Sequence, residues 1–184
     1  THCISSAASD VYKRQILISV MFANNEIGTI EPVREIGEIA HKHGILFHTD
    51  AVQAMCHVPI NVTEMNIDLL SASAHKFHGP KGVGFMYMKN STKLEPFIHG
   101  GAQERARRAG TSNVSGIVGM GQAVKLALGT LDKDTHTIIN MRNYIVDRIL
   151  GEIPDVTFDG PCIDANADAN ADVNAVSVLS LIHI

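Results

Sequence analysis

Hydrophobic and polar positions along the first part of the chain predict a strand, a helix and a second strand. An almost unbroken apolar and β-branched run at residues 16–23 is typical of a strand buried on both faces of a parallel sheet. Pro32 suits the first turn of a helix, its apolar residues recur on one face, and Gly44 suits its end. A second strand at residues 45–48 completes a βαβ unit.

The pattern continues with shorter strands and longer helices. Strands are predicted around residues 67–72 and at 83–88, the second returning antiparallel after a Gly-Pro turn. Apolar residues at helical spacing predict two helices, at about residues 113–128 and 132–150. A short strand near residues 156–158 follows. The succession indicates an α/β fold built on a mainly parallel sheet with helices on both faces.

Composition narrows the class of protein. With 184 residues, of which 45% are hydrophobic, the chain can bury a core of useful size. The net charge is −4, and the basic residues gather only at Arg105, Arg107 and Arg108, so a general nucleic-acid binder is not indicated. No apolar run approaches the length of a membrane span, and the start lacks the layout of a signal peptide.

The cysteines indicate the compartment. Three cysteines lie far apart without a Cys-x-x-Cys pair, which argues against a disulfide framework and against a structural zinc site. We therefore expect a reducing, cytoplasmic setting.

Four parts can be distinguished along the chain. Residues 1–15 and 177–184 resemble translated sequencing-adapter sequence, and we predict that this leader and this tail are not native. Residues 16–160 are predicted to form the large domain. Residues 161–176 repeat Asp-Ala-Asn-Ala with variation, have too few large apolar groups to pack, and lack the spacing of a calcium loop, which predicts a mobile linker.

Two polar segments at predicted strand ends can supply the groups that bind pyridoxal 5'-phosphate. This cofactor needs an amine for its aldehyde, which Lys76 offers, and a carboxylate for its ring nitrogen, which Asp50 offers. Ser73 and His75 are typical donors to a phosphate. Glycines within residues 79–84 allow the backbone to pass close to a ligand. The sequence therefore predicts a pyridoxal phosphate site at the carboxyl edge of the sheet.

Each of these residues also has a simpler interpretation. A lysine at a strand end is usually a solvated charge, and Asp50 could cap a helix that starts at Ala51. Gln53 would lie on the first turn of that helix, where it could donate to the ring oxygen of the cofactor. Asn25, which follows the first strand, could simply serve a turn.

Other sites are less well supported. Residues 79–84 lack the order of a nucleotide-binding loop. Several histidines invite a zinc site, but none shows the His-Glu-x-x-His arrangement, so no metal is predicted. The arginine cluster with Thr111, next to two glycines, could bind an anion such as phosphate or could be a solvated loop.

Together, five motifs resemble the cysteine desulfurases, which are class V aminotransferase-like enzymes of the fold-type I pyridoxal phosphate superfamily. The resemblance covers about residues 16–160. The motifs stand in this order: NNEIG at 24–28, HTDAVQ at 48–53, SAHK at 73–76, GPKGVG at 79–84 and HGGAQER at 99–105.

The resemblance implies a role for each matched residue. Lys76 would hold the aldehyde of pyridoxal 5'-phosphate, Asp50 would pair with the ring nitrogen, and Gln53 would donate to the ring oxygen. Ser73 and His75 would hold the phosphate.

Two further residues carry implied roles. Asn25 would lie near the ring oxygen and the substrate carboxylate, and Thr111 would reach the phosphate of the partner subunit in a homodimer. The implied reaction takes sulfur from L-cysteine, leaves alanine, and stores the sulfur as a persulfide on an enzyme cysteine. A sulfur-acceptor or scaffold protein would then receive it for iron–sulfur cluster and thio-cofactor assembly.

The chain departs from this family in what it lacks. The persulfide cysteine of the family lies on a loop far beyond Lys76, and Cys3, Cys56 and Cys162 do not match it. The upstream phosphate loop, the stacking histidine and the carboxylate-binding arginine are also missing. We therefore expect an internal fragment that is inactive alone. A selenocysteine lyase, a class V aminotransferase and an inert remnant remain alternatives.

Overall fold

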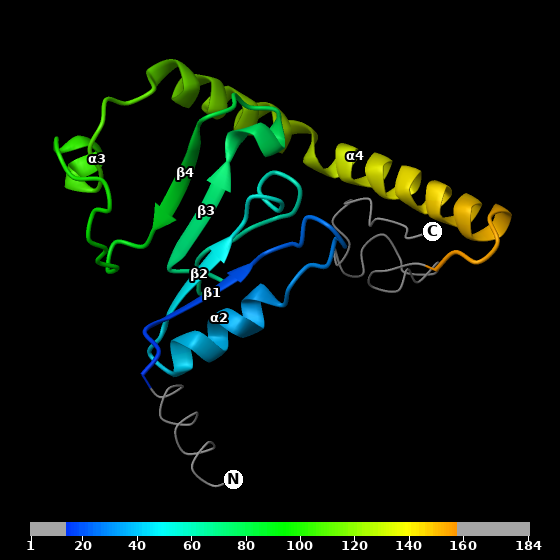
Figure 1. Ribbon diagram of the computed structural model, residues 1–184, viewed down its shortest axis with the longest axis horizontal. Coiled ribbons are helices and arrows are strands. Elements are labelled where there is room, and N and C mark those ends of the chain that lie inside the picture. Colours follow the sequence, from blue (N-terminus) through cyan, green and yellow to red (C-terminus); the bar gives the residue numbers. More distant parts are fainter. Residues whose placement is uncertain (1–13, 158–184) are drawn as a thin grey trace, which may run out of the picture.

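The structure, a computed structural model, describes residues 14–157, and it contains one mixed four-stranded sheet with helices (Figure 1). The strands lie in the order β1-β2-β3-β4; the first three are parallel, and β4 is antiparallel to β3. The predicted βαβ unit and the antiparallel return are confirmed. The elements are β1 (Leu17–Met21), α2 (Val33–Lys42), β2 (Leu46–Asp50), β3 (Leu69–Ser73), η1 (Ala74–Phe77), β4 (Gly84–Met88), α3 (Gln103–Ala106) and α4 (Val114–Glu152).

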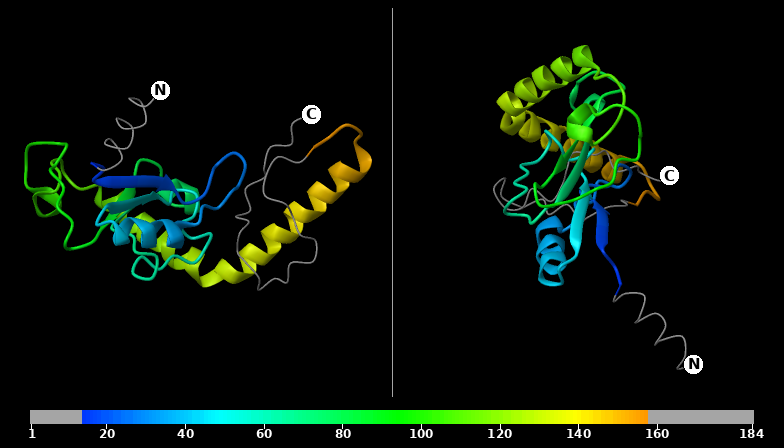
Figure 2. Two further views of the ribbon diagram at one scale, coloured as in Figure 1. Left: turned by 90° about the horizontal axis from the view of Figure 1, so that it is seen from below. Right: turned by 90° about the vertical axis from the view of Figure 1, so that its left-hand side faces the viewer.

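Helix α2 lies close against the sheet. It starts after Pro32 and stops just before Gly44, whose positive φ of 66° favours glycine. Gly37 faces the backbone carbonyl of Met65 so closely that a side chain there would collide with it. Figure 2 shows α2 and the first turns of α4 on the same side of the sheet, so within residues 14–157 neither long helix covers the other face.

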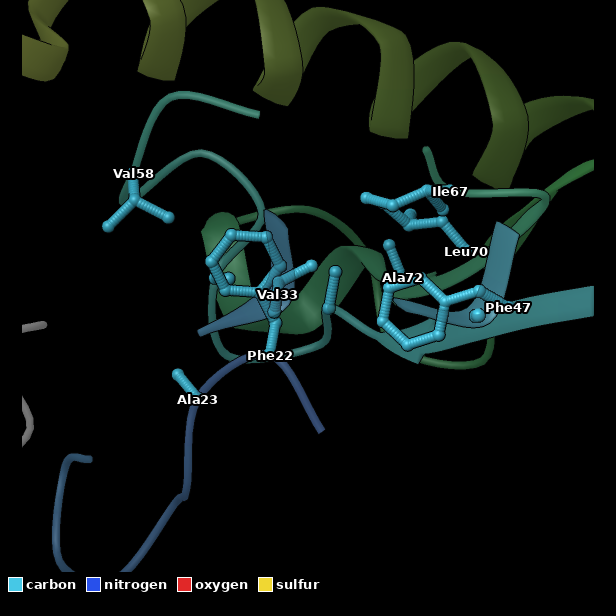
Figure 3. Close-up of a cluster of buried hydrophobic side chains, with 11 residues drawn as sticks. Phe22, Ala23, Val33, Phe47, Val58, Ile67, Leu70 and Ala72 are labelled. Atoms are coloured by element: carbon cyan, nitrogen blue, oxygen red, sulfur yellow. The ribbon is translucent and has the colours of Figure 1, made fainter. Parts of the chain in front are cut away.

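The main core lies between α2 and the sheet. Along β2, Phe47 and Thr49 are fully buried, whereas the alternate residues His48 and Asp50 are half-buried. Side chains from α2, from β3 and from the segments that follow β1 and β2 complete the core (Figure 3): Phe22, Ala23, Val33, Ala40, Ala51, Ala54, Val58, Ile67, Leu70 and Ala72. The sheet therefore has a covered face, defined by Phe47, Thr49 and Ala72, and an open face that carries His48 and Asp50.

Strand β1 differs from its prediction. The apolar run at residues 16–23 predicted a strand buried on both faces, but within the described residues β1 pairs only with β2 and forms an edge. Leu17 is accordingly 44% exposed. Burial on both faces requires covering layers on both sides, and in the described part of the chain α2 supplies only one.

The two helices predicted for the second half form a single helix, α4, of 39 residues. The expected break near Gly129 fails because no proline follows it, and an isolated glycine costs a helix only about 1 kcal/mol. Thr130 lies within the helix, and its Oγ1 donates a hydrogen bond to Asp134 Oδ2 at 2.5 Å. The predicted apolar stripe is largely exposed; Val118, for example, is 66% exposed.

By length and composition alone, helix α4 could cross a membrane. Its most apolar segment has a mean hydropathy of 1.3, and 11% of that segment is buried in the structure. One such helix is weak support for a membrane span. Residues 156 and 157 are not in a strand, contrary to the prediction. Three predicted parts of the chain lie outside the described residues. They are the linker at 161–176, the tail at 177–184 and nearly all of the leader at 1–15.

Candidate cofactor site at the carboxyl edge of the sheet

The parallel strands bring the predicted site residues to one edge. Asp50 is the last residue of β2, and its Cα is paired with Met21 of β1 and Ser71 of β3. Ser73 ends β3, two residues further on, so the alternation of strand side chains places it on the same open face as Asp50. Lys76 follows within η1.

Asp50 is held in a fixed orientation. Its Oδ1 accepts a hydrogen bond from Val52 N at 2.9 Å, which forms a turn and not a helix cap, because residues 52–57 form turns. The helix expected after Ala51 is therefore wrong. Within residues 14–157 no hydrogen bond reaches the second carboxylate oxygen, Oδ2. A half-buried carboxylate with one free oxygen can accept an N–H from a ligand ring.

The turn after β3 presents hydrogen-bond donors and an amine. Ser73 Oγ and His75 Nδ1 are joined by a hydrogen bond of 2.8 Å. In η1 the residues Ala74 and Phe77 are buried, whereas His75 and Lys76 between them are exposed. Phe77 thus anchors the turn in the protein, and the lysine lies on its accessible side.

His57, which no sequence motif placed in the site, holds this turn by a hydrogen bond to its backbone. His57 Nε2 donates a hydrogen bond to the backbone oxygen of Lys76 at 3.0 Å. Cys56, the residue before it, has a positive φ of 64° and packs with Phe77 and Ala123 of α4. The segment after Asp50 is thereby connected to the turn that carries Lys76. No local motif indicated this contact, because it joins residues 19 apart through a turn.

A second missed group lies on the open face. His48 Nδ1 is hydrogen-bonded to Ser19 Oγ at 2.7 Å, and His48 Nε2 to Ser71 Oγ at 2.6 Å. Burial lowers the pKa of His48, and the charge of Asp50 opposes part of that shift. The signal was available in the sequence: His48 and Asp50 are two residues apart in one strand and therefore share a face.

The remaining predicted residues, Asn25, Gln53 and Thr111, form no hydrogen bond with these groups in the part of the chain that the structure describes. Asn25 is exposed in a turn that Asn24 Oδ1 stabilises by accepting hydrogen bonds from Glu26 N at 2.8 Å and Ile27 N at 3.0 Å. Gln53 is half-buried. Thr111 is exposed, and in the described structure no hydrogen bond links it to the other site residues.

The arginine cluster is partly engaged within its own loop. Arg108 Nη1 donates to Gly110 O at 2.8 Å, and Arg108 Nη2 lies 3.3 Å from Glu104 Oε1. Arg105 and Arg107 are exposed.

The side chains at the sheet edge fit pyridoxal phosphate by their chemistry. An exposed amine, a hydroxyl–imidazole pair and a carboxylate with a free oxygen match the aldehyde, phosphate and ring nitrogen, respectively. A cavity of about 390 Å³ lies elsewhere, between α4 and the side of η1 that carries Phe77, and it is lined by none of the predicted site residues. Among the described residues no group of His, Cys, Asp or Glu could hold a metal ion.

Comparisons with known proteins agree with this fold. The family model described as "Aminotransferase class-V" matches residues 3–181. A cysteine desulfurase IscS from Dictyoglomus turgidum is 54% identical over 149 residues, which are 81% of this chain and 38% of that protein. A solved NifS-like protein is 40% identical with a TM-score of 0.76, over 80% of this chain and 40% of the other.

A second solved structure shows a relative with a ligand. It is described as SspA in complex with cysteine, is 46% identical, and has a TM-score of 0.59 over 64% of this chain and 36% of the other. The chain belongs to the class-V aminotransferase family, with a partial fold-type I α/β domain. It spans 38% of the length of the Dictyoglomus relative.

Proposed function

We propose that the full-length protein is a pyridoxal phosphate-dependent cysteine desulfurase. The main support is the position of Lys76, Asp50 and Ser73 at the carboxyl edge of three parallel strands. The chain is also 54% identical to a cysteine desulfurase. In the overall reaction the Cβ–S bond of L-cysteine breaks and an enzyme thiol takes up the sulfur as a persulfide. L-Alanine leaves with the hydrogen that balances the equation.

The bound cofactor would supply an aldehyde that links to amines and a ring that accepts electrons. Lys76 would hold the aldehyde and, once released, would move a proton at the α-carbon of the substrate. Asp50 Oδ2 would accept the ring N–H, and Gln53 would donate to the ring oxygen. Ser73 and His75, already joined at 2.8 Å, would donate to the phosphate.

Two residues would act outside this group. Asn25, exposed just beyond β1, would lie near the ring oxygen and the substrate carboxylate. Thr111 would reach the phosphate in the partner subunit of a homodimer, which agrees with its exposed position.

The thiol that receives sulfur is not Cys56 in this proposal. Cys56 is buried, and burial raises the pKa of its thiol, which disfavours the thiolate that must attack the substrate sulfur. A mobile, accessible cysteine is required. We therefore expect the chain of residues 1–184 alone to be inactive, and the sulfur to pass in the full-length enzyme to an acceptor or scaffold protein for iron–sulfur cluster and thio-cofactor assembly in the cytoplasm.

Product analysis of the full-length protein tests the proposal. Incubation with L-cysteine should yield alanine and persulfide in equal amounts. Faster turnover of L-selenocysteine would favour a selenocysteine lyase, and an amino acid formed from a keto acid without released sulfur would favour an aminotransferase. No cofactor absorbance and no product with any substrate would show an inert remnant and contradict the proposal.

A further inference from the structure

We propose that His48 is a positioning residue of the cofactor site, which uses Ser19 and Ser71 to fix the strand positions around Asp50. This inference rests on the proposed function, because it assigns Asp50 to the cofactor ring.

The first observation is a bridge of side chains across three strands. Ser19 of β1, His48 of β2 and Ser71 of β3 are joined by hydrogen bonds of 2.7 and 2.6 Å. Both ring nitrogens of His48 are therefore engaged. The bridge lies on the open face, opposite the side on which Phe47 packs in the core.

The second observation connects this bridge to Asp50. Ser71 is the Cα partner of Asp50 on β3, and its carbonyl accepts a hydrogen bond from Ala51 N at 2.9 Å. Ser71 is thus held at its hydroxyl by His48 and at its carbonyl by the residue after Asp50. On the other side, Phe22 N donates to Asp50 O at 2.8 Å. Asp50 lies between these attachments, so the bridge would help to fix the backbone that carries its carboxylate.

The third observation concerns charge. A neutral imidazole suits two hydroxyl partners, because each hydroxyl can donate or accept. The burial that lowers the pKa of His48 favours this neutral form. Asp50 is the charged group that acts on His48, and the side chains facing it from β1 and β3, Ser19 and Ser71, do not ionise near neutral pH. A neutral His48 leaves the charge of Asp50 available to a ring N–H.

The test compares His48→Leu with His48→Gln in the full-length protein. Glutamine keeps one donor and one acceptor, whereas leucine keeps neither. The readouts are the affinity of the apoprotein for pyridoxal phosphate and its thermal midpoint without cofactor. His48→Leu should weaken the affinity about tenfold, and His48→Gln should stay within about threefold of wild type, as expected for one half-buried hydrogen-bonded group. The exposed His41, changed to Leu, is the control and should bind as wild type does.

Ser71→Ala provides a milder variant if His48→Leu does not fold. It should weaken cofactor binding while the apoprotein stays folded. Unchanged affinity in both folded variants would overturn the inference, and so would equal losses for His48→Gln and His48→Leu that follow their thermal midpoints. If wild type itself binds no pyridoxal phosphate, the proposed function fails first, and this outcome is distinct from a change confined to the variants.

Discussion

The two faces of the sheet differ in what they carry. The covered face bears Phe47 and Thr49, both fully buried, together with Ala72, and it packs against α2. The open face bears His48 and Asp50 in the same strand. His48 is hydrogen-bonded to Ser71 of the neighbouring strand, and one carboxylate oxygen of Asp50 is free to accept a hydrogen bond from a ligand. One strand thus serves the core with every second residue and the candidate site with the others. Substitutions on the two faces should therefore affect different properties.

The largest effect is expected from Lys76, at the carboxyl edge of the sheet. Lys76→Ala in the full-length protein should lower alanine production from L-cysteine by at least about a thousandfold, because it removes both the cofactor attachment and the proton carrier. The free energy of unfolding of the apoprotein should change by less than about 0.5 kcal/mol, since Lys76 is exposed. Turnover assays and urea unfolding measure the two quantities. A Lys76→Ala variant that keeps wild-type turnover would contradict a catalytic role for this lysine.

On the covered face the effect should be on stability. Phe47→Ala should lower the free energy of unfolding by about 3–5 kcal/mol, because it empties a fully buried site. Met86→Ala is the matched control on β4, where the side chain is 58% exposed, and its cost should stay below about 0.5 kcal/mol. Urea unfolding of the apoproteins measures both. Similar losses for the two variants would contradict the division between faces.

A polar residue on the covered face sharpens the comparison. Thr49 is fully buried, and its Oγ1 has no hydrogen-bond partner among residues 14–157. Thr49→Val keeps the shape and removes the unpaired hydroxyl, so it should raise the free energy of unfolding by about 1 kcal/mol. A decrease in urea unfolding experiments would show that this hydroxyl is satisfied in solution.

The smallest effect is expected from the titration of His48. Burial lowers the pKa of His48 in the folded protein below 6.5, so the unfolded chain takes up a proton first as the pH falls. Stability should therefore decrease below pH 6.5, by less than about 1 kcal/mol because the ring is half-exposed to screening solvent. His48→Gln should remove this part of the pH dependence in urea unfolding of the apoprotein. An identical pH dependence in wild type and variant would contradict the assignment.

Much of the fold could be predicted from local patterns. The strand order of the βαβ unit, the end of α2 at Gly44 and the antiparallel β4 depend on apolar spacing and turn residues, which act within a few positions. The exposure of β1 and the continuity of α4 could not be predicted in this way. The first depends on which layers cover the sheet, and the second on a glycine whose small cost a helix tolerates.

In the candidate site, too, local patterns were informative and contacts between distant residues were not. Asp50, Ser73 and Lys76 could be predicted as a group because motif and strand end coincide, and the structure places all three at the carboxyl edge of the sheet. His57 was missed as a partner of Lys76 because that contact joins two turns distant in sequence. His48 stands in the matched motif at residues 48–53 but received no role there, although its spacing from Asp50 already placed both on one face.

The most direct test of the central claim is to locate the cofactor attachment. Borohydride reduction of the full-length protein with bound pyridoxal phosphate, followed by peptide mapping, should place the label on Lys76. A label on another lysine, such as the exposed Lys81 a few residues further on, would contradict the assignment of the carboxyl edge of the sheet as the cofactor site.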